Sequence, residues 1–443
     1  MMLRYIFIIL AILPLWLSAQ VGPLSFEGRE QATVGVYVAP IGGKPVVASG
    51  ASRLLVPAST TKCITAAACV LGLPEDFRFE TRVYATGSVH SGKVEGDIVI
   101  VGAGDPTLES AHFPDNSGFV SDFYATLQRH GASGATGSLE FDGNGFPAMG
   151  YGAGWMVEDI GCDYGAGLYA INYRDNKMSV VVDATGSARP SAPVEVIDML
   201  GVGKRDVNSY PMPEIGALML YGSRPASGST VSAVVSNPVP WQTLAAEIET
   251  VCKFDNEPVE GCSGKMELLM THRSPCRDEI LRSLMRRSDN LYAEGMLRAL
   301  LPDSCSMRTA SLAVAAERRL LASAGIDASG QKILDGSGLS RNALVTPGFM
   351  GRMLDVMARY EAYPALFPKV GREGTVKRLL KGTRLEGRLA LKSGSMGGVL
   401  CYAGYKLDGN GRPTHVVVIM VNNFLCKPSE IRKAVEHYLL KIF

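Results

Sequence analysis

Alternating apolar and polar residues indicate strands at both ends of the 443-residue chain. Residues 33–40 alternate with the two-residue period of a strand, and residues 44–49 follow a Gly-Gly turn as the returning strand of a hairpin. Residues 398–407 and 414–422 are also strand-like, with a polar turn between them. We therefore predict an antiparallel sheet to which both ends of the chain contribute.

Two helices are predicted beside these strands. Residues 428–442 carry apolar residues at the spacing of an amphipathic helix. A run of small and apolar residues, 63–71, predicts a buried helix that begins at Ser59, just after a Pro-Ala pair. Together, the two ends of the chain predict an α+β domain in which helices flank an antiparallel sheet.

The middle of the chain has a different pattern. Short strand-like runs occur there between clusters of Gly, Pro and Ser, at residues 97–101, 177–182, 216–220 and 230–235. The chain is also longer than a single core usually supports. We therefore predict an inserted β-rich region at residues 83–270, within a split domain built from residues 20–82 and 271–443.

Residues 1–19 have the pattern of a signal peptide. Arg4 precedes an apolar stretch, residues 5–17, and Leu17-Ser18-Ala19 forms a small-residue cleavage site. The stretch is short for a spanning helix, although an uncleaved anchor is the alternative. We expect an exported protein with no integral membrane span after leader cleavage.

Charge and cysteine content exclude several classes of function. A net charge of +1 gives no support for nucleic-acid binding. The nine cysteines include no Cys-x-x-Cys pair, and no H-E-x-x-H occurs, so neither a metal site nor a redox site is predicted. In an exported protein some cysteines can pair, and the candidates are Cys252 with Cys262 and Cys401 with Cys426.

Three short segments carry candidate chemistry: Ser59-Thr60-Thr61-Lys62, Ser288-Asp289-Asn290 and Lys392-Ser393-Gly394. Their order matches the S-x-x-K, S-x-N and K-[ST]-G signature of serine enzymes that react with penicillin. Each segment alone is weak evidence, because a second S-x-x-K begins at Ser329 and a second S-x-N at Ser340. Taken singly, the serines could be helix caps and the lysines solvated charges. Only their conjunction favours a catalytic site.

The chemistry explains why these residue types would act together. A serine hydroxyl is a poor nucleophile until a base takes its proton, and Lys62 lies one helical turn after Ser59. Lys62 must be neutral for this role, and burial beside a second cation, Lys392, would favour the neutral form. Ser288 is predicted to relay the proton toward the leaving amine, and Asn290 to bond Lys62 or the substrate amide.

The third segment is predicted to bind substrate. Lys392 and Ser393 would bind the carboxylate at the substrate's C-terminal end, with Gly394 and Ser395 beside them. The backbone N–H groups of Ser59 and Ser395 would form an oxyanion hole, in which one donor typically lowers the barrier by about 3 kcal/mol.

Longer segments around these residues resemble the S13 peptidases, the penicillin-binding protein 4-like D-alanyl-D-alanine carboxypeptidases/endopeptidases. The matching segments are residues 288–294 (SDN-L-x-AE), 102–108 (G-x-GDP-x-L) and 335–347 (DGSGLS-x-x-N-x-x-TP, with Asn342 one position early). Gly374-Thr375 also matches, and Ser393 replaces a more usual Thr while keeping the hydroxyl. The resemblance covers most of the chain after the leader and is weakest between residues 142 and 260.

The resemblance implies a penicillin-recognising fold and a reaction. Ser59 would attack a D-Ala-D-Ala-type bond in peptidoglycan stem peptides, and water would hydrolyse the acyl-enzyme. β-Lactams would acylate the same serine as covalent inhibitors, and no metal or organic cofactor is implied. The inserted region would form two small domains, and the enzyme would act in the periplasm or on the cell-wall side of the cytoplasmic membrane.

Two other functions remain as alternatives. A serine β-lactamase would use the same residues and deacylate penicillin rapidly. A catalytically inactive wall-binding protein would not need them intact. The sequence leaves open the preference between carboxypeptidase and endopeptidase activity, the third residue of the stem peptide, the disulfide pairing and the oligomeric state. It also leaves open whether the inserted region shapes the cleft, docks on the wall or is a passive scaffold.

Overall fold

The computed structural model describes residues 22–143, 145–185, 187–201, 206–257 and 266–443. The chain divides into two compact units. The first unit comprises the chain up to Leu73, residues 281–289 and residues 314–443, and the second comprises residues 74–280 and 290–313. The predicted leader lies outside the described residues, and the domain limits predicted from the sequence stay a prediction.

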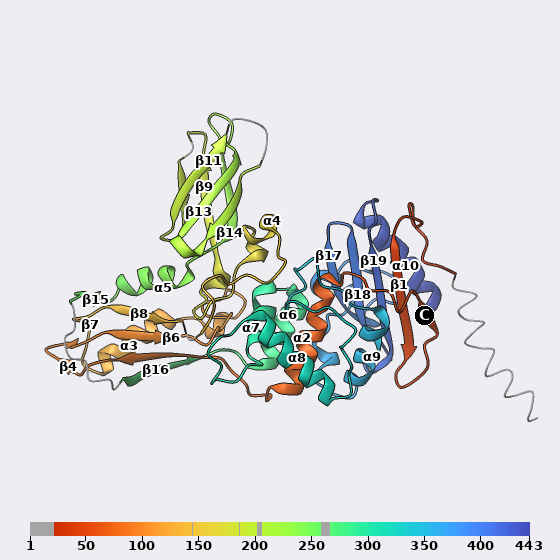
Figure 1. The fold of residues 1–443 in the computed structure, drawn as a ribbon, viewed down its shortest axis with the longest axis horizontal. Helices are drawn as coiled ribbons and strands as arrows, with labels where there is room; N and C mark the ends of the chain where they lie inside the picture. The colour runs from red at the N-terminus through yellow and green to blue at the C-terminus, as the bar shows by residue number, and fades with distance from the viewer. Residues whose placement is uncertain (1–21, 144, 186, 202–205, 258–265) are drawn as a thin grey trace, which may run out of the picture. The chain divides into compact units, whose positions relative to one another are not determined.

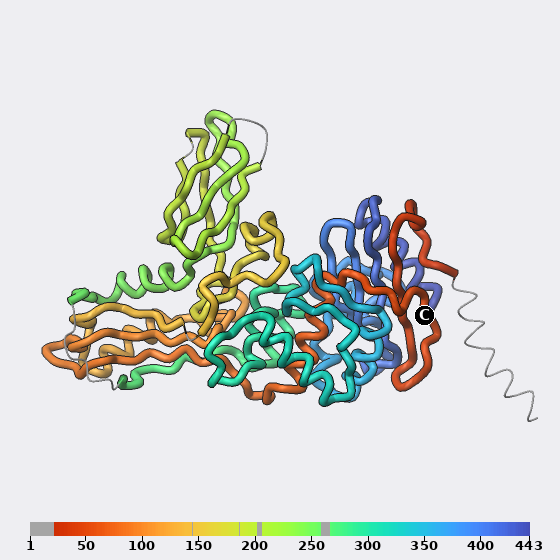
Figure 2. Tube along the Cα trace, viewed as in Figure 1, coloured from red at the N-terminus to blue at the C-terminus, as the bar shows by residue number. Residues whose placement is uncertain are grey.

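A five-stranded antiparallel sheet of order β17-β18-β19-β1-β2 forms the centre of the first unit (Figure 1). Its strands are β1 (Thr33–Pro40), β2 (Val47–Ser49), β17 (Leu389–Met396), β18 (Val399–Leu407) and β19 (Pro413–Asn422). β1 pairs with β19 along its whole length, so the first and last strands lie side by side (Figure 2). This pairing confirms that both ends of the chain build one sheet.

Helices cover both faces of this sheet. α10 (Pro428–Ile442), which has the predicted bounds, packs its apolar side into the same core as Val36 and Val38 of β1. Tyr37 points to the other side of β1, where it lies against Gly351 of α9 (Pro347–Met357). Because both faces are covered, residues 416–421 of β19 are apolar without alternation and buried. The unit also contains α2 (Thr61–Gly72) and most of α6 (Arg277–Arg287) and α8 (Ala310–Ser323).

The second unit contains two hydrophobic cores. One is formed by α3 (Phe119–Arg129), α5 (Pro240–Glu249) and two four-stranded sheets, of orders β16-β3-β6-β8 and β15-β7-β5-β4. The other is formed by two three-stranded sheets, of orders β10-β9-β14 and β11-β13-β12. The four strand-like runs predicted in this region correspond to β6, β9, β13 and β14.

The strands of the first core are β3 (Glu80–Ala85), β4 (Val89–His90), β5 (Lys93–Val94), β6 (Ile98–Val101), β7 (Gly134–Ala135), β8 (Leu139–Asp142), β15 (Lys253–Phe254) and β16 (Glu267–Arg273). Those of the second core are β9 (Lys177–Asp183), β10 (Ala188–Pro190), β11 (Glu195–Gly201), β12 (Asn208–Met212), β13 (Ala217–Ser223) and β14 (Thr230–Ser236). Two further helices are α4 (Val157–Ile160) and α7 (Asn290–Arg298).

The predicted pairing of Cys401 with Cys426 is wrong, because both residues are free thiols. Cys401 is buried in β18 with its thiol directed at the Val56 carbonyl, 3.5 Å away, whereas Cys426 follows the end of β19 and is half-buried. Cys262, half of the other candidate pair, lies outside the described residues. Over the part of the chain that is described, no helix has both the length and the apolar character needed to cross a membrane.

Candidate active site

Ser59 lies in a strained turn that precedes α2. The turn, η1 (Ala58–Thr60), holds Ser59 two residues before the helix, so α2 begins at Thr61 rather than at the predicted Ser59. Ala58 has a φ of 46°, a left-handed conformation that is unfavourable for a residue with a side chain. The hydroxyl of Thr61 donates to the Ala58 carbonyl at 2.9 Å and stabilises the turn.

Lys62 is fully buried in the first turn of α2, with its ammonium beside the serine hydroxyl. The distance between Lys62 Nζ and Ser59 Oγ is 3.0 Å, and Nζ also donates to the Ser337 carbonyl at 2.7 Å. The loop that carries Ser337 is fixed by Asp335, whose carboxylate accepts backbone N–H groups of Gly338 and Ser340 at 2.8 Å each. The structure therefore brings the predicted nucleophile and the predicted base into hydrogen-bond reach.

Glycine is required where this loop passes the nucleophile turn. A Cβ at Gly338 would lie 2.0 Å from the Ala58 carbonyl oxygen, and Gly338 has a φ of +75°. Only glycine tolerates both the close approach and the positive φ. The Asp-Gly-Ser-Gly segment therefore brings its backbone close to the nucleophile turn.

Lys392 and Ser288 form a second pair. Lys392 is fully buried in β17, and its Nζ donates to Ser288 Oγ at 2.9 Å and to the Ser393 carbonyl. Burial, and then the charge of Lys62, lower the pKa of Lys392 well below its ordinary value. Ser288 has a φ of 64°, so this serine is also held in a left-handed conformation.

The rest of the K-S-G segment packs against the nucleophile turn. A Cβ at Gly394 would lie 2.7 Å from the Pro57 carbonyl oxygen and 3.0 Å from the backbone nitrogen of Ser59, so β17 can pass this closely only with glycine there. The hydroxyls of Ser393 and Thr375 are 2.6 Å apart, and Ser395 is exposed at the end of the strand. Thr375 is a site residue that the motifs alone did not assign, although the Gly-Thr match drew attention to it.

Asn290 is the predicted site residue that belongs to the second unit. It begins α7, and its side-chain amide donates to the Tyr164 carbonyl at 2.8 Å. Its predicted bond to Lys62 or to substrate stays a prediction.

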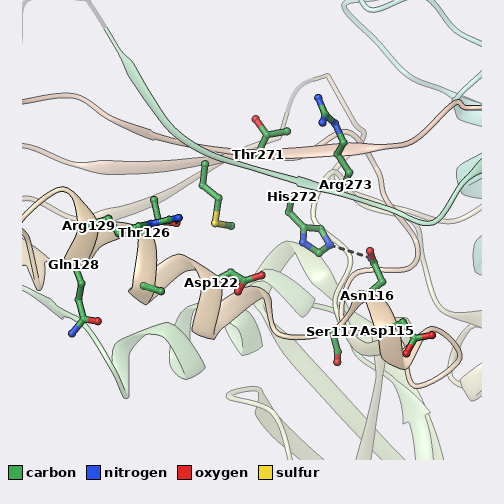
Figure 3. A pocket seen from close by; sticks show the side chains of 12 residues that line it. Asp115, Asn116, Ser117, Asp122, Thr126, Gln128, Arg129, Thr271, His272 and Arg273 are labelled. Carbon is green, nitrogen blue, oxygen red and sulfur yellow. Dashed lines mark hydrogen bonds between the residues drawn. The ribbon is translucent and has the colours of Figure 1, made fainter.

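A sizeable cavity lies elsewhere, in the second unit. It has a volume of about 740 Å³ and lies between α3 and β16, where His272 points toward Asn116 at 3.1 Å (Figure 3). Burial lowers the pKa of His272, and none of the residues predicted for catalysis lines this cavity. Size alone therefore does not locate the chemistry in this molecule.

Known proteins of one family match most of the chain. The family model described as "D-Ala-D-Ala carboxypeptidase 3 (S13) family" matches residues 17–211 and 241–441. The D-alanyl-D-alanine carboxypeptidase DacB of Haemophilus influenzae is 26% identical over 433 residues, covering 90% of this chain and 87% of that protein. A D-alanyl-D-alanine carboxypeptidase of an Actinomadura species is also 26% identical, over 86% of this chain and 76% of its own length.

Solved structures agree at the level of the fold. The crystal structure of penicillin binding protein 4 from Haemophilus influenzae superposes with a TM-score of 0.78 at 22% sequence identity, covering 96% of this chain and 97% of that one. A second structure of that protein, complexed with a β-lactam, gives a TM-score of 0.74. The predicted fold class is confirmed.

Proposed function

Because the chain belongs to the S13 family of D-Ala-D-Ala carboxypeptidases, we propose that it cleaves D-Ala-D-Ala-type bonds in peptidoglycan through an acyl-enzyme on Ser59. The family match confirms the predicted family and enzyme class. The observation that carries the residue assignment is the 3.0 Å separation of Lys62 Nζ and Ser59 Oγ in a buried turn.

The first step is attack of Ser59 Oγ on the carbonyl carbon of the scissile bond. The hydroxyl proton passes to Lys62 Nζ as the C–O bond forms, and the backbone N–H groups of Ser59 and Ser395 hold the oxyanion. Close packing of Gly394 against the Ser59 turn supports this pairing of donors, because it holds the two segments at van der Waals distance. Collapse of the intermediate breaks the C–N bond and leaves the acyl-enzyme.

Ser288 and Lys392 supply the proton to the departing amine. Ser288 Oγ accepts from Lys392 Nζ at 2.9 Å, so its own proton is free to point toward the leaving nitrogen. Because the pKa of Lys392 is lowered, a state in which only one of Lys62 and Lys392 is protonated is favoured. Asn290 orients the substrate amide, and water then hydrolyses the ester on Ser59.

The substrate's terminal carboxylate binds at β17. The paired hydroxyls of Ser393 and Thr375, with Lys392 behind them, form a donor group suited to a carboxylate. Export by the leader would bring the enzyme to peptidoglycan in the periplasm or on the cell-wall side of the membrane. β-Lactams would acylate Ser59 as structural mimics of the substrate.

A fluorescent penicillin tests this assignment. We expect covalent labelling of the wild type and of Ser329→Ala, which removes the serine of the exposed second S-x-x-K, but none of Ser59→Ala. Labelling that persists in Ser59→Ala would refute the nucleophile. Digests of muropeptides then separate carboxypeptidase from endopeptidase activity, and a chromogenic β-lactam turned over rapidly would favour a β-lactamase instead.

A further inference from the structure

A cavity of about 500 Å³ lies entirely within the second unit and contains none of the residues assigned above to the reaction. Three arginines line it, Arg78, Arg82 and Arg308, together with two acids, Glu80 and Asp303. An apolar wall completes it, which includes Phe77, Val101 and Leu301. Pockets that combine an apolar wall with a few convergent polar groups are typical of ligand sites.

Glu80, one of the two acids in the lining, is already neutralised. Glu80 accepts from Arg82 Nε and Nη2 through Oε2, at 3.1 and 2.6 Å, and from Arg273 Nε through Oε1, at 3.1 Å. These two guanidinium groups lower the pKa of Glu80, which therefore stays ionised. Glu80 is thus bonded to Arg82 and to Arg273, which lies outside the lining, while Arg78 and Arg308 form no hydrogen bond to it.

Arg308 lacks a comparable partner. Its side chain is only 6% exposed, and Nη2 donates to the Pro302 carbonyl at 3.2 Å. The nearest carboxylate oxygen, on Asp303, is 3.6 Å away on a fully exposed side chain, where water screens the ion pair. Within the described part of the chain Nε has no hydrogen-bond partner, although a buried guanidinium normally needs its donors satisfied.

Arg78 adds a third positive group. It is exposed, and its Nη1 donates to the Ser274 carbonyl at 2.6 Å, so its bond is to a neutral oxygen rather than to an acid. The cavity therefore combines an excess of guanidinium charge with an apolar wall. Guanidinium groups bind carboxylate and phosphate through paired hydrogen bonds, so the ligand chemistry is that of such an anion.

We propose that this cavity is a second peptidoglycan-binding site, which holds a stem-peptide carboxylate on Arg78 and Arg308. The proposal rests on the proposed function, because that function makes peptidoglycan the polymer presented to the protein. A stem peptide offers carboxylates next to apolar methyl groups, which match the guanidinium groups and the apolar wall. The site anchors the polymer independently of the bond that Ser59 cleaves.

Sedimentation with purified sacculi tests the proposal. Mature protein is first acylated on Ser59 with penicillin, which blocks the reaction site, and is then titrated with sacculi. We expect Arg78→Ala and Arg308→Gln each to weaken binding by about tenfold or more, while Arg189→Ala, a control at a 64% exposed arginine on β10, binds like the wild type. Arg78 is exposed, so its variant keeps the test valid if Arg308→Gln fails to fold.

Two treatments of the sacculi identify the anion. Conversion of their carboxylates to methylamides is expected to abolish the difference between the wild type and the arginine variants. Removal of phosphodiester polymers with hydrofluoric acid is expected to leave this difference in binding unchanged. If the difference disappears after hydrofluoric acid, the anion that the arginines bind is a phosphate rather than a carboxylate, and the proposal is overturned.

The outcomes separate this proposal from the proposed function. If the arginine variants bind untreated sacculi as tightly as the wild type, the cavity is not a peptidoglycan-binding site. Penicillin labelling of Ser59 would be unaffected by that result. If the wild type takes no penicillin, the proposed function fails, and sedimentation of the unacylated protein still decides whether the arginines bind sacculi.

Discussion

Both the Ser59 site and the arginine cavity contain buried cations, but the two regions use different residues for them. Lys62 and Lys392 are fully buried in the first unit, and the pKa of Lys392 is lowered well below its ordinary value. A buried lysine can therefore release its proton, whereas a guanidinium stays protonated in proteins. The first region can thus move protons, while the second presents a permanent charge that needs an anion.

The difference follows from the neighbours of each group. Lys62 and Lys392 face hydroxyl and carbonyl oxygens, of Ser59, Ser337 and Ser288. Such neutral acceptors can accept a hydrogen bond from lysine in its protonated form and also in its neutral form. Arg308 also donates to a neutral carbonyl, that of Pro302, but its guanidinium stays protonated by its own chemistry and lies 5.9 Å above the ring of Phe146, an arrangement that favours a delocalised cation. The same comparison predicts which substitutions each region tolerates.

The largest effect is expected from Lys62→Arg. The substitution keeps the positive charge next to Ser59 but removes the ability to accept a proton at neutral pH. We expect the rate of acylation by penicillin to fall by about 10³-fold or more, as for loss of a general base. Single-turnover labelling measures this rate. Retention of wild-type acylation in Lys62→Arg would show that proton transfer to this residue is not needed.

A smaller effect is expected from Lys392→Gln, which keeps a donor toward Ser288 but removes the second cation. Because the pKa of Lys392 is lowered by burial and by Lys62, the acylation rate of the wild type should fall as pH decreases and both lysines become protonated. We expect Lys392→Gln to reduce the acylation rate by about 10²-fold and to shift the pH at which the rate falls on the acid side of the profile. The measurement is the pH–rate profile of penicillin labelling. If the acid-side fall in rate occurs at the same pH in the wild type and the variant, the two lysines are not coupled.

Gly394→Ala tests the packing that holds the two segments together. Its Cβ would meet the Pro57 carbonyl oxygen at 2.7 Å, so β17 must move away from the Ser59 turn. We expect acylation to slow by about tenfold, since a displaced oxyanion donor is weaker rather than absent. Gly397→Ala provides the control, because a Cβ there meets only the end of the Arg341 side chain. Equal rates for the two variants would show that this contact does not shape the site.

Much of the first unit could be predicted from the sequence because its signals are local and strong. The 428–442 helix has its predicted bounds, and the strand and hairpin patterns at the two ends do meet in one sheet. The three motifs identified Ser59, Lys62, Ser288 and Lys392, which the structure brings together in two hydrogen-bonded pairs.

The contacts that complete the site were not predictable in the same way. The carbonyl that accepts from Lys62 lies 275 residues away in sequence, and the Thr375–Ser393 contact joins two segments by their fold rather than by a pattern. The positive φ angles of Ala58 and Ser288 leave no trace in residue type, because neither position is glycine. The predicted pairing of Cys401 with Cys426 failed because a disulfide needs two side chains in suitable positions, which residue type does not reveal.

The last effect concerns stability rather than the reaction rate, at Asp105, a buried group of the second unit that, like lysine and unlike arginine, can lose its charge. Its Oδ1 accepts from the backbone N–H of Thr107 at 2.8 Å and from the Thr107 hydroxyl at 2.6 Å. Burial raises its pKa from 3.8 to about 6. Since the folded state holds the proton more tightly, this carboxyl lowers stability as pH rises from about 4 to about 6, by up to about 3 kcal/mol.

Asp105→Asn removes this cost while keeping an oxygen for Thr107. We expect the free energy of unfolding of the variant, relative to the wild type, to increase by about 2–3 kcal/mol between pH 4 and pH 7. Denaturant unfolding at a series of pH values measures it. Asp183→Asn is the matched control, because the pKa of Asp183 is lowered by Thr185 and neighbouring groups and its removal should have the opposite pH trend. If the difference in unfolding free energy between Asp105→Asn and the wild type does not change with pH, the Asp105 carboxyl stays ionised when buried. The contrast with the arginines, which keep their charge, would then apply only to Lys62 and Lys392.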